Sequence, residues 1–248
     1  MRVNLTDQVA LVTGSAHRVG RAVALELARA GVHILVHYNS ASEETVKDTL
    51  REIKSLGVEA YAVQADVSTR EGVDKTFDAL RTHFGRLDIL VNSASIFQKR
   101  TLMEVTLEEW QETLAINLTA PFLCTQEAVK LMRQNTPSGG CIINICDRGS
   151  VAPLVDYAHH GVSKAGLWAL TRVSAASLGP DIRVNAIIPG AVLKPPDYSE
   201  ETWLKLASKT PLGRPGTAED VGRAVVYLAS EDFLTGVLLH VDGGDSLI

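Results

Sequence analysis

Short apolar runs alternate with longer segments of helical periodicity along most of the chain. The first run, 9–12, is too short for a buried helix, and the apolar residues between Ala22 and Ala30 follow helical spacing. Strands that alternate with helices in this way are typical of parallel βαβ units. Further runs with the length of buried strands lie at 32–37, 59–64, 87–92, 141–145, 182–188 and 238–241.

Two of the expected helices begin with a capping signal. Thr106 is followed three residues later by Glu109, and Thr217 by Asp220. In such a pair the hydroxyl and the acid each accept a hydrogen bond from a backbone N–H of the first turn. The local signals therefore agree with the apolar periodicity.

The segment 189–216 is rich in loop-forming residues and contains five of the nine prolines. Long loops in compact domains are often functional, so we expect this segment to act as a lid over a substrate. A solvated connection without a role is the alternative interpretation. Within the segment, 199–208 has the pattern of a short amphipathic helix.

The turn between the first strand and the first helix has the features of a phosphate site. Gly14 and Gly20 bound it, and glycine lets a ligand approach the backbone closely. The free N–H groups of a helix start attract anions. An ordinary turn with two glycines would show the same pair, but its place between a strand and a helix favours the phosphate site.

Composition and charge narrow the class of protein. The 248 residues are 46% apolar but only 5% aromatic, as expected for helices on a sheet of small aliphatic residues. We find no apolar run that could span a membrane and no signal segment, and a net charge of −5 without a basic cluster argues against nucleic acid. Three cysteines cannot all pair, so a reduced cytosol is expected, with Cys124 and Cys141 as core residues. No metal site is predicted.

Several motifs in a fixed order resemble the short-chain dehydrogenase/reductase family. They include TGSAHRVG at 13–20, LDILVNSAS at 87–95, RVNAIIPGAV at 183–192 and VDGG at 241–244. The series is completed by the pair of Asp66, which is acidic, and Val67, by Asn117 in INLTAPF and by Lys164 in SKAGL. The resemblance implies one Rossmann-type α/β domain over 1–248, doubly wound, with a seven-stranded parallel sheet and helices on both faces. It also implies a small-molecule substrate and a homotetramer.

The family pattern places a nicotinamide dinucleotide along the carboxyl ends of the strands. The cofactor-binding residues that it implies are Gly14, His17, Arg18, Val19, Gly20, His37, Tyr38, Asn39, Ser40, Asp66, Val67, Asn92, Ser93, Ala94, Lys164, Pro189, Gly190 and Val192.

One departure from the family loop bears on the choice of cofactor. Arg18 stands at the position of the middle glycine, as in pteridine reductases, and HYNS at 37–40 fits the same branch. No acid follows the second strand until Glu43, whereas an enzyme for NAD commonly has one there for the ribose hydroxyl. The guanidinium fork of Arg18, with Asn39 and Ser40, suits a 2′-phosphate better. We therefore expect NADP(H).

The catalytic positions also depart from the family. Counting back from Lys164, the usual tyrosine is His160 and the usual serine is Asp147. Aspartate at this position resembles pteridine reductases, but those enzymes keep the tyrosine. Tyr157 lies seven residues before Lys164, about 10 Å along a helix, while the four-residue spacing gives about 6 Å. Tyr157 is therefore expected to form a partly buried wall of the substrate pocket.

Three versions of the centre remain open. In the first, His160 is the general acid. In the second, Asp147 delivers the proton through water while His160 orients it. In the third, the site binds the cofactor without turnover. Family resemblance implies that Lys164 holds the nicotinamide ribose and that Asn117 holds a water in the proton path. His159 is expected to be an ordinary surface or helix-start residue.

The substrate residues expected are Ser95, Phe97, Asp147 and Tyr157, with the ring of Phe97 facing a flat heterocycle or else buried in the core. The resulting prediction is a cytosolic NADPH-dependent oxidoreductase that reduces a small C=O or C=N group, with a pterin as the leading substrate. The alternatives are a catalytically impaired NADP(H)-binding regulatory protein, and a reductase of ketones or 3-oxoacyl thioesters.

Overall fold

A seven-stranded parallel sheet forms the centre of the computed structural model, which describes residues 3–194 and 198–248. The strand order is β3-β2-β1-β4-β5-β6-β7, which confirms the predicted α/β fold and its doubly wound sheet. The strands are β1 Val9–Val12, β2 His33–Tyr38, β3 Ala60–Gln64, β4 Ile89–Asn92, β5 Gly140–Ile145, β6 Ile182–Pro189 and β7 Leu238–Val241.

Each predicted strand lies within two residues of an observed one. β1 and β4 are buried along their whole length, because helices cover both faces of the sheet. A strand that is buried on both faces shows a continuous apolar run rather than an alternating one. This is why the runs in the sequence located the strands.

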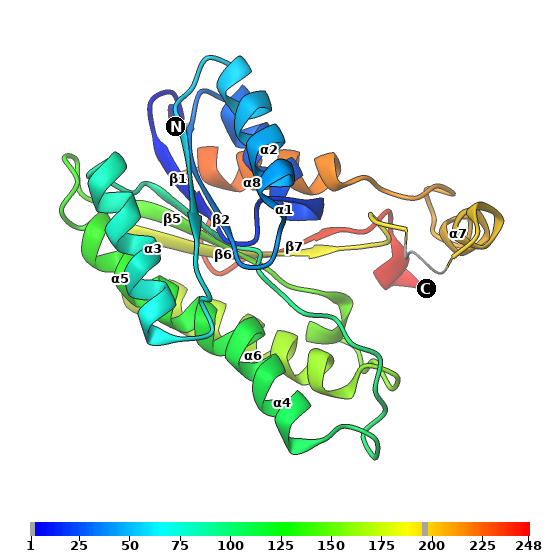
Figure 1. Ribbon diagram of the computed structural model, residues 1–248. Helices are drawn as coiled ribbons and strands as arrows, with labels where there is room; N and C mark the ends of the chain where they lie inside the picture. The colour runs from blue at the N-terminus through cyan, green and yellow to red at the C-terminus, as the bar shows by residue number, and fades with distance from the viewer. Residues whose placement is uncertain (1–2, 195–197) are drawn as a thin grey trace.

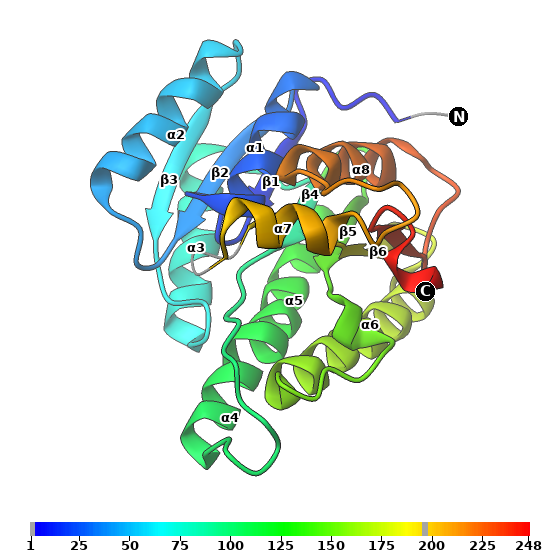
Figure 2. The same cartoon turned by 90° about the vertical axis from the view of Figure 1, so that its right-hand side faces the viewer.

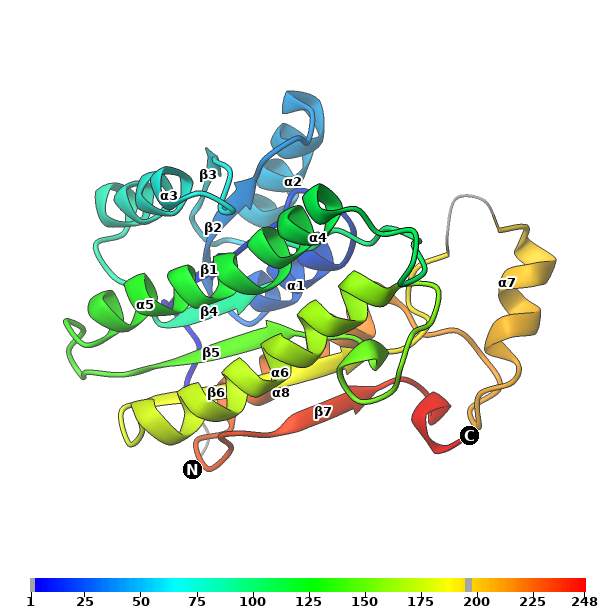
Figure 3. The ribbon, with the colours of Figure 1, turned by 90° about the horizontal axis from the view of Figure 1, so that it is seen from below.

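The helices form two layers, with α1, α2 and α8 on one face of the sheet and α3, α4, α5 and α6 on the other (Figures 1 and 3). The capping boxes predicted at Thr106 and Thr217 are both present, at the starts of α4 and α8. The helices are α1 Arg18–Arg29, α2 Glu43–Ser55, α3 Arg70–His83, α4 Leu107–Leu114, α5 Ala120–Met132, α6 Ala158–Leu178, α7 Glu200–Ala207 and α8 Ala218–Ser230.

A separate apolar core lies on each face of the sheet. Val23, Leu27 and Val225 belong to the core under α1 and α8, whereas Phe77 and Leu131 belong to the core under α3 and α5. The cysteines are free and buried within these layers, as expected for Cys124 and Cys141. Burial raises the pKa of the Cys124 thiol to about 12, so this thiol stays protonated.

A polar contact crosses the otherwise apolar sheet between β4 and β5. Asn92 and Asn144 are register partners, and Asn92 Nδ2 donates to Asn144 Oδ1 at 2.8 Å. Asn144 Nδ2 in turn donates to Thr171 Oγ1 of α6 at 2.8 Å. The chain of hydrogen bonds ties both strands to the helix that packs on them.

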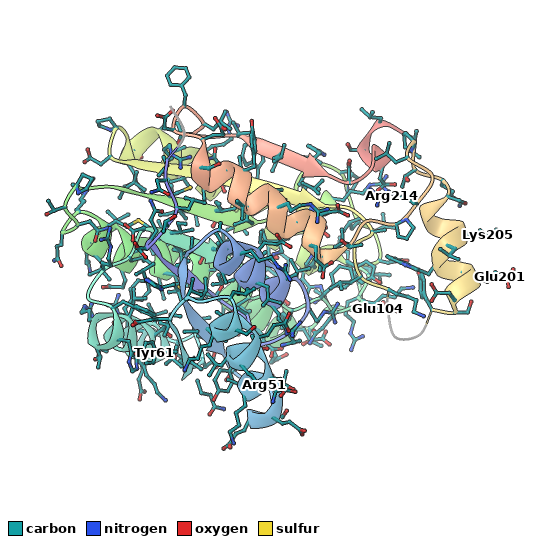
Figure 4. The ribbon with its side chains drawn as sticks, turned by 90° about the horizontal axis from the view of Figure 1, so that it is seen from above. Arg51, Tyr61, Glu104, Glu201, Lys205 and Arg214 are labelled. Atoms are coloured by element: carbon teal, nitrogen blue, oxygen red, sulfur yellow. The ribbon has the colours of Figure 1, made fainter. Side chains whose placement is uncertain are left out.

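All seven strands end at the same edge of the sheet, and the chain changes direction between β1 and β4. Such a switch point is where open α/β sheets bind ligands. Figure 2 looks onto this edge and shows α7 in front of it. Glu201 and Lys205 on α7 point away from the body, whereas Arg51 and Tyr61 lie well apart from α7, along the lower side of the view (Figure 4).

The segment 189–216 follows β6 and carries α7, as expected for a helix at 199–208. Residues 195–197 of this segment lie outside the described residues. Among the helices of the described part, none is both long and apolar enough to cross a membrane.

Candidate active site

The loop that follows β1 is fixed against the turn that follows β4. Thr13 Oγ1 accepts hydrogen bonds from the backbone N–H groups of Ser93 and Ala94, both at 3.0 Å. Gly14 has a φ of +67°, and a Cβ there would lie 3.0 Å from Cα of Ala94. The two loops therefore meet at the switch point of the sheet, where the sequence places the dinucleotide.

The start of α1 is open to an anion. A Cβ on Gly20 would lie 2.3 Å from the carbonyl oxygen of Gly14, so only glycine allows this close approach. His17 precedes the helix without a side-chain hydrogen bond to its first turn. The N–H groups of that turn and the positive end of the helix dipole therefore fit a phosphate.

Arg18 adopts a backbone conformation that favours glycine. Its φ is +55°, which costs an L-residue with a side chain about 1–2 kcal/mol. The side chain is exposed and has no polar partner in the described part of the chain. Asn39 and Ser40, at the end of β2, are exposed as well. Strain of this kind is often retained at functional sites.

The side chain of His37 holds the loop that follows β1. Gly14 N donates to His37 Nδ1 at 3.1 Å, and His37 Nε2 lies 3.0 Å from the carbonyl oxygen of Ala65. Since Nδ1 accepts, the ring is neutral with its proton on Nε2. Burial lowers the pKa of His37 to about 4.

Three residues expected to contact the cofactor are buried in this structure. The side chain of His37 is occupied by the loop, that of Asn92 by Asn144, and Val67 is packed in the core under α3. These three side chains support the loops and the core, and the prediction that the three residues bind the cofactor stays a prediction. The remaining predicted cofactor residues lie along the carboxyl edge, and their contacts stay predictions.

Asp147 and His160 are brought together by the end of β5 and the first turn of α6. Oδ1 of Asp147 lies 3.7 Å from Nε2 of His160. His160 is 3% exposed, and its Nε2 has no hydrogen-bond partner within the described structure. A buried ring nitrogen without a partner, next to a carboxylate, is suited to exchange a proton with a bound molecule.

The opposite side of the His160 ring is fixed. Nδ1 lies 3.0 Å from the carbonyl oxygen of Ile96 and 3.4 Å from Nδ2 of Asn117. The two N–H groups of Asn117 are already donated to Ile96 O and Ser163 Oγ, at 3.1 and 3.0 Å. We therefore place a proton on Nδ1 of His160, which donates a hydrogen bond to the carbonyl oxygen of Ile96.

Asn117 lies in a single π-helical turn, Ala115–Thr119, between α4 and α5. Such turns are often found at functional sites. Its Oδ1 accepts from Ser95 Oγ at 3.1 Å and from Ile96 N at 2.9 Å, so it fixes the turn after β4. This places Ser95 and Asn117 beside the ring of His160.

Asp147 is held as a carboxylate. Burial opposes its ionisation, but the nearby His160 imidazole, the N–H of Gly149 and the Lys164 ammonium together hold its pKa below the usual range. Gly149 N donates to Oδ1 at 2.7 Å. Lys164 is 4% exposed and its Nζ donates to the carbonyl oxygen of Ile145 at 2.8 Å. Burial lowers the pKa of Lys164, while Asp147 works in the opposite direction.

A cavity of about 210 Å³ opens beside Asp147 and is lined by Phe97 and Tyr157. The two rings stack at 4.2 Å, and the edge of Phe97 faces the ring of His160 at 4.6 Å. Tyr157 is partly buried and lines the cavity, as expected, while its contact with a substrate stays a prediction. The core alternative for Phe97 is wrong, since 57% of the residue is exposed.

His159 lies at the start of α6, which confirms the expected helix-start position, but the expected surface placement is wrong. It is fully buried, and both of its ring nitrogens lack a hydrogen-bond partner in the described structure. It packs where α4 and α6 meet. Burial lowers its pKa, with Glu109 working in the opposite direction.

Arg148 and the C-terminal wall of the cavity are parts of the site that were not among the predicted site residues. Arg148 lines the cavity next to Asp147, and its position after a catalytic candidate was the available signal. The wall formed by the C-terminal residues is brought to the site by β7 from nearly a hundred residues away, and its signal in the sequence was the VDGG motif at 241–244, which contains Asp242. Its members at the cavity are His240, Asp242, Asp245 and Ser246.

Comparisons with known proteins agree with this geometry. A family model described as enoyl-(acyl carrier protein) reductase matches residues 14–246. The 3-oxoacyl-[acyl-carrier-protein] reductase FabG of Aquifex aeolicus is 35% identical over 256 residues, which cover 98% of this chain and 99% of that protein. The 3beta-hydroxysteroid dehydrogenase 1 of Eggerthella lenta is 36% identical, with 98% and 95% covered.

Solved structures give the same result. A short-chain alcohol dehydrogenase from Sinorhizobium meliloti superimposes with a TM-score of 0.91 at 32% identity, covering 98% of each chain. The angucycline C-6 ketoreductase LanV, solved with bound NADP, has a TM-score of 0.90 at 31% identity and covers 99% of this chain and 98% of its own.

Proposed function

Because the chain belongs to the short-chain dehydrogenase/reductase family of oxidoreductases, we propose that it reduces a ketone or a 3-oxoacyl thioester with NADPH. Its relatives are named for reactions at 3-oxoacyl groups, a steroid 3-hydroxyl and an angucycline ketone. They do not support the pterin as the leading substrate, so the ketone and thioester alternative takes its place.

One observation carries the chemistry, namely the 3.7 Å approach of the Asp147 carboxylate to the unpartnered Nε2 of His160. NADPH, when bound, supplies the hydride. His160 donates a proton from Nε2 to the oxygen of the substrate, where negative charge develops. Because Nδ1 donates to the carbonyl oxygen of Ile96, Nε2 is the ring nitrogen on the side of Asp147, which lines the cavity.

Asp147 stabilises the protonated ring and does not supply the proton itself. Its lowered pKa keeps it ionised at neutral pH, so it is a poor proton donor. A carboxylate beside an imidazole favours the imidazolium form and orients the ring, as in hydrolase triads. Of the three versions left open by the sequence, this geometry supports His160 as the acid.

The preference for NADPH rests on Arg18. A strained, exposed cation at the start of α1, without a partner of its own among the described residues, suits a 2′-phosphate. The close approach at Gly14 and Gly20 suits a diphosphate at this loop, and Lys164, which donates to the carbonyl oxygen of Ile145, is the residue expected to hold the nicotinamide ribose. The predicted homotetramer stays a prediction.

The test is NADPH oxidation under single-turnover conditions with 3-oxoacyl thioesters, ketones and dihydropterins, and with NADPH binding followed in parallel. Consumption with a ketone or thioester is expected. Consumption confined to dihydropterins would reinstate the pterin substrate. Tight NADPH binding without consumption in any arm would favour the binding-only alternative over this proposal.

A further inference from the structure

The cavity beside Asp147 has two walls of different chemistry. One wall is apolar and includes the stacked rings of Phe97 and Tyr157, with Val151, Leu154 and Ile188. The other is polar and consists of Arg148 and the C-terminal residues His240, Asp242, Asp245 and Ser246. A substrate with an apolar body and one polar or charged end fits this division.

The carboxylate of Asp242 is already fully used. Its Oδ1 accepts from Gly244 N at 2.9 Å and its Oδ2 from Ser246 N at 3.0 Å. His240 Nδ1 lies 3.5 Å from the same Oδ2. Asp242 therefore fixes the C-terminal turn Asp245–Leu247 and has no free oxygen with which to bind a substrate.

Arg148 is used far less completely. Its guanidinium has one polar partner among the described residues, Asp245, through Nη1 to Oδ2 at 3.1 Å. That contact joins the turn after β5 to the C-terminal turn, which lie next to each other in Figure 3. The Arg148 side chain is 48% exposed, so four of its five N–H donors remain available at the cavity.

The guanidinium of Arg148 is matched less completely than the other charged groups around the cavity. The buried ammonium of Lys164 balances the carboxylate of Asp147. Asp245 compensates Arg148 through a single contact, which leaves the planar fork of the guanidinium unmatched. A carboxylate that binds such a fork with both oxygens has the better geometry.

We propose that Arg148 determines substrate specificity by binding a carboxylate at the end of the substrate remote from the reacting ketone. Asp245 is its counter-ion when the cavity is empty, and it competes with the substrate carboxylate. This inference rests on the proposed ketone reductase function and narrows its substrate class to oxo acids.

The test compares 2-oxobutanoate, 4-oxopentanoate and 5-oxohexanoate with their methyl esters, for the wild type, R148Q and D245N. R148Q should lower kcat/KM for the best acid by about 10- to 100-fold, because a charged hydrogen-bond pair is lost, and change the ester by less than about threefold. D245N should raise kcat/KM for the acid severalfold, because the competing carboxylate is removed. R51Q is the control, since Arg51 pairs with Asp48 at the far end of the molecule (Figure 4).

An equal loss for acid and ester in R148Q would overturn the proposal, because it would show a structural role. An unchanged acid in R148Q, or a preference of the wild type for the esters, would overturn it as well. If the wild type reduces neither, calorimetry with NADPH and pentanoate or methyl pentanoate separates the two ideas. Pentanoate binding that is lost in R148Q would support the carboxylate site while the reductase proposal fails, and absence of that binding would overturn both.

Discussion

Nε2 of His160 lies 3.7 Å from Oδ1 of Asp147, while Nδ1 of the same ring lies 3.0 Å from the carbonyl oxygen of Ile96. The ring thus spans a carboxylate on one side and a backbone carbonyl on the other. Of these two groups, only the carbonyl oxygen of Ile96 is within hydrogen-bond distance, so Nε2 stays without a partner among the described residues. This geometry supports the proposal that the pair departing from the family pattern donates the proton.

Replacing His160 by Phe should lower the single-turnover rate of ketone reduction by about 10²–10⁴, the usual contribution of a general acid. The NADPH dissociation constant should stay unchanged, because the ring contacts Ile96, Asp147 and Phe97 rather than the loop after β1. Replacing His160 by Tyr, the family residue, should preserve much of the rate. If H160Y folds and binds NADPH but has no activity, histidine and tyrosine do not share one role here.

Replacing Asp147 by Asn should slow reduction by about 10- to 100-fold, because the site loses the carboxylate that lies 3.7 Å from Nε2 of His160. The single-turnover rate and the NADPH dissociation constant check this. A loss of NADPH affinity as large as the loss in rate would show that Asp147 only maintains the shape of the site.

Replacing Arg18 by Gly should separate cofactor choice from folding. NADPH affinity should fall by about 10- to 100-fold through loss of a charged contact, with NADH affinity nearly unchanged. Relief of the left-handed backbone gains about 1–2 kcal/mol, and the greater freedom of glycine in the unfolded chain offsets about 0.5–1 kcal/mol. Urea unfolding should therefore show equal or slightly higher stability. R18K, which keeps the charge, should lose less NADPH affinity than R18G.

Replacing Gly20 by Ala should damage the cofactor loop. The new Cβ would lie 2.3 Å from the carbonyl oxygen of Gly14, and such overpacking costs about 1–3 kcal/mol in the free energy of unfolding. NADPH affinity should fall with it. Gly179 is the matched control, because the nearest atom to a Cβ there is 3.8 Å away. Equal effects of G20A and G179A would contradict the close approach.

His37 should make the fold sensitive to acid. Its pKa is about 4 in the folded chain against an ordinary 6.5, so the unfolded chain binds the proton first as pH falls. The contribution of the neutral His37 to the free energy of unfolding is fully present above pH 6.5. It is lost as pH falls towards 4, with about 2 kcal/mol lost by pH 5. Urea unfolding at pH 7.5 and pH 5 measures this loss. H37N, which keeps an acceptor for Gly14 N–H, should show a smaller pH dependence.

Much of the fold could be predicted from the sequence because its signals are local. Continuous apolar runs marked the strands, and the pairs at Thr106 and Thr217 marked two helix starts that the structure confirms. The neighbourhood of Asp147 and His160 followed from their spacing to Lys164 along one strand end and one helix.

The rest depends on contacts between segments distant in the sequence. His159 is buried because α4 packs against α6, which no pattern around the histidine reveals. The left-handed conformation of Arg18 and the ion pair between Arg148 and Asp245 likewise arise only after the strands are assembled. Sequence patterns identify the residues of a site more readily than the groups that orient them.

The Asn92–Asn144 contact has a further consequence, which concerns alignment. Apolar strands resemble themselves after a shift along the chain, so hydrophobic burial alone distinguishes poorly between neighbouring alignments of β4 and β5. A shifted pairing would leave two buried amides unmatched, at about 1–3 kcal/mol each. The turn with Ser95 and Phe97 follows β4, and Asp147 follows β5. The amide pair thus fixes the register of β4 and β5, and with it the distance between the predicted site residues that follow them.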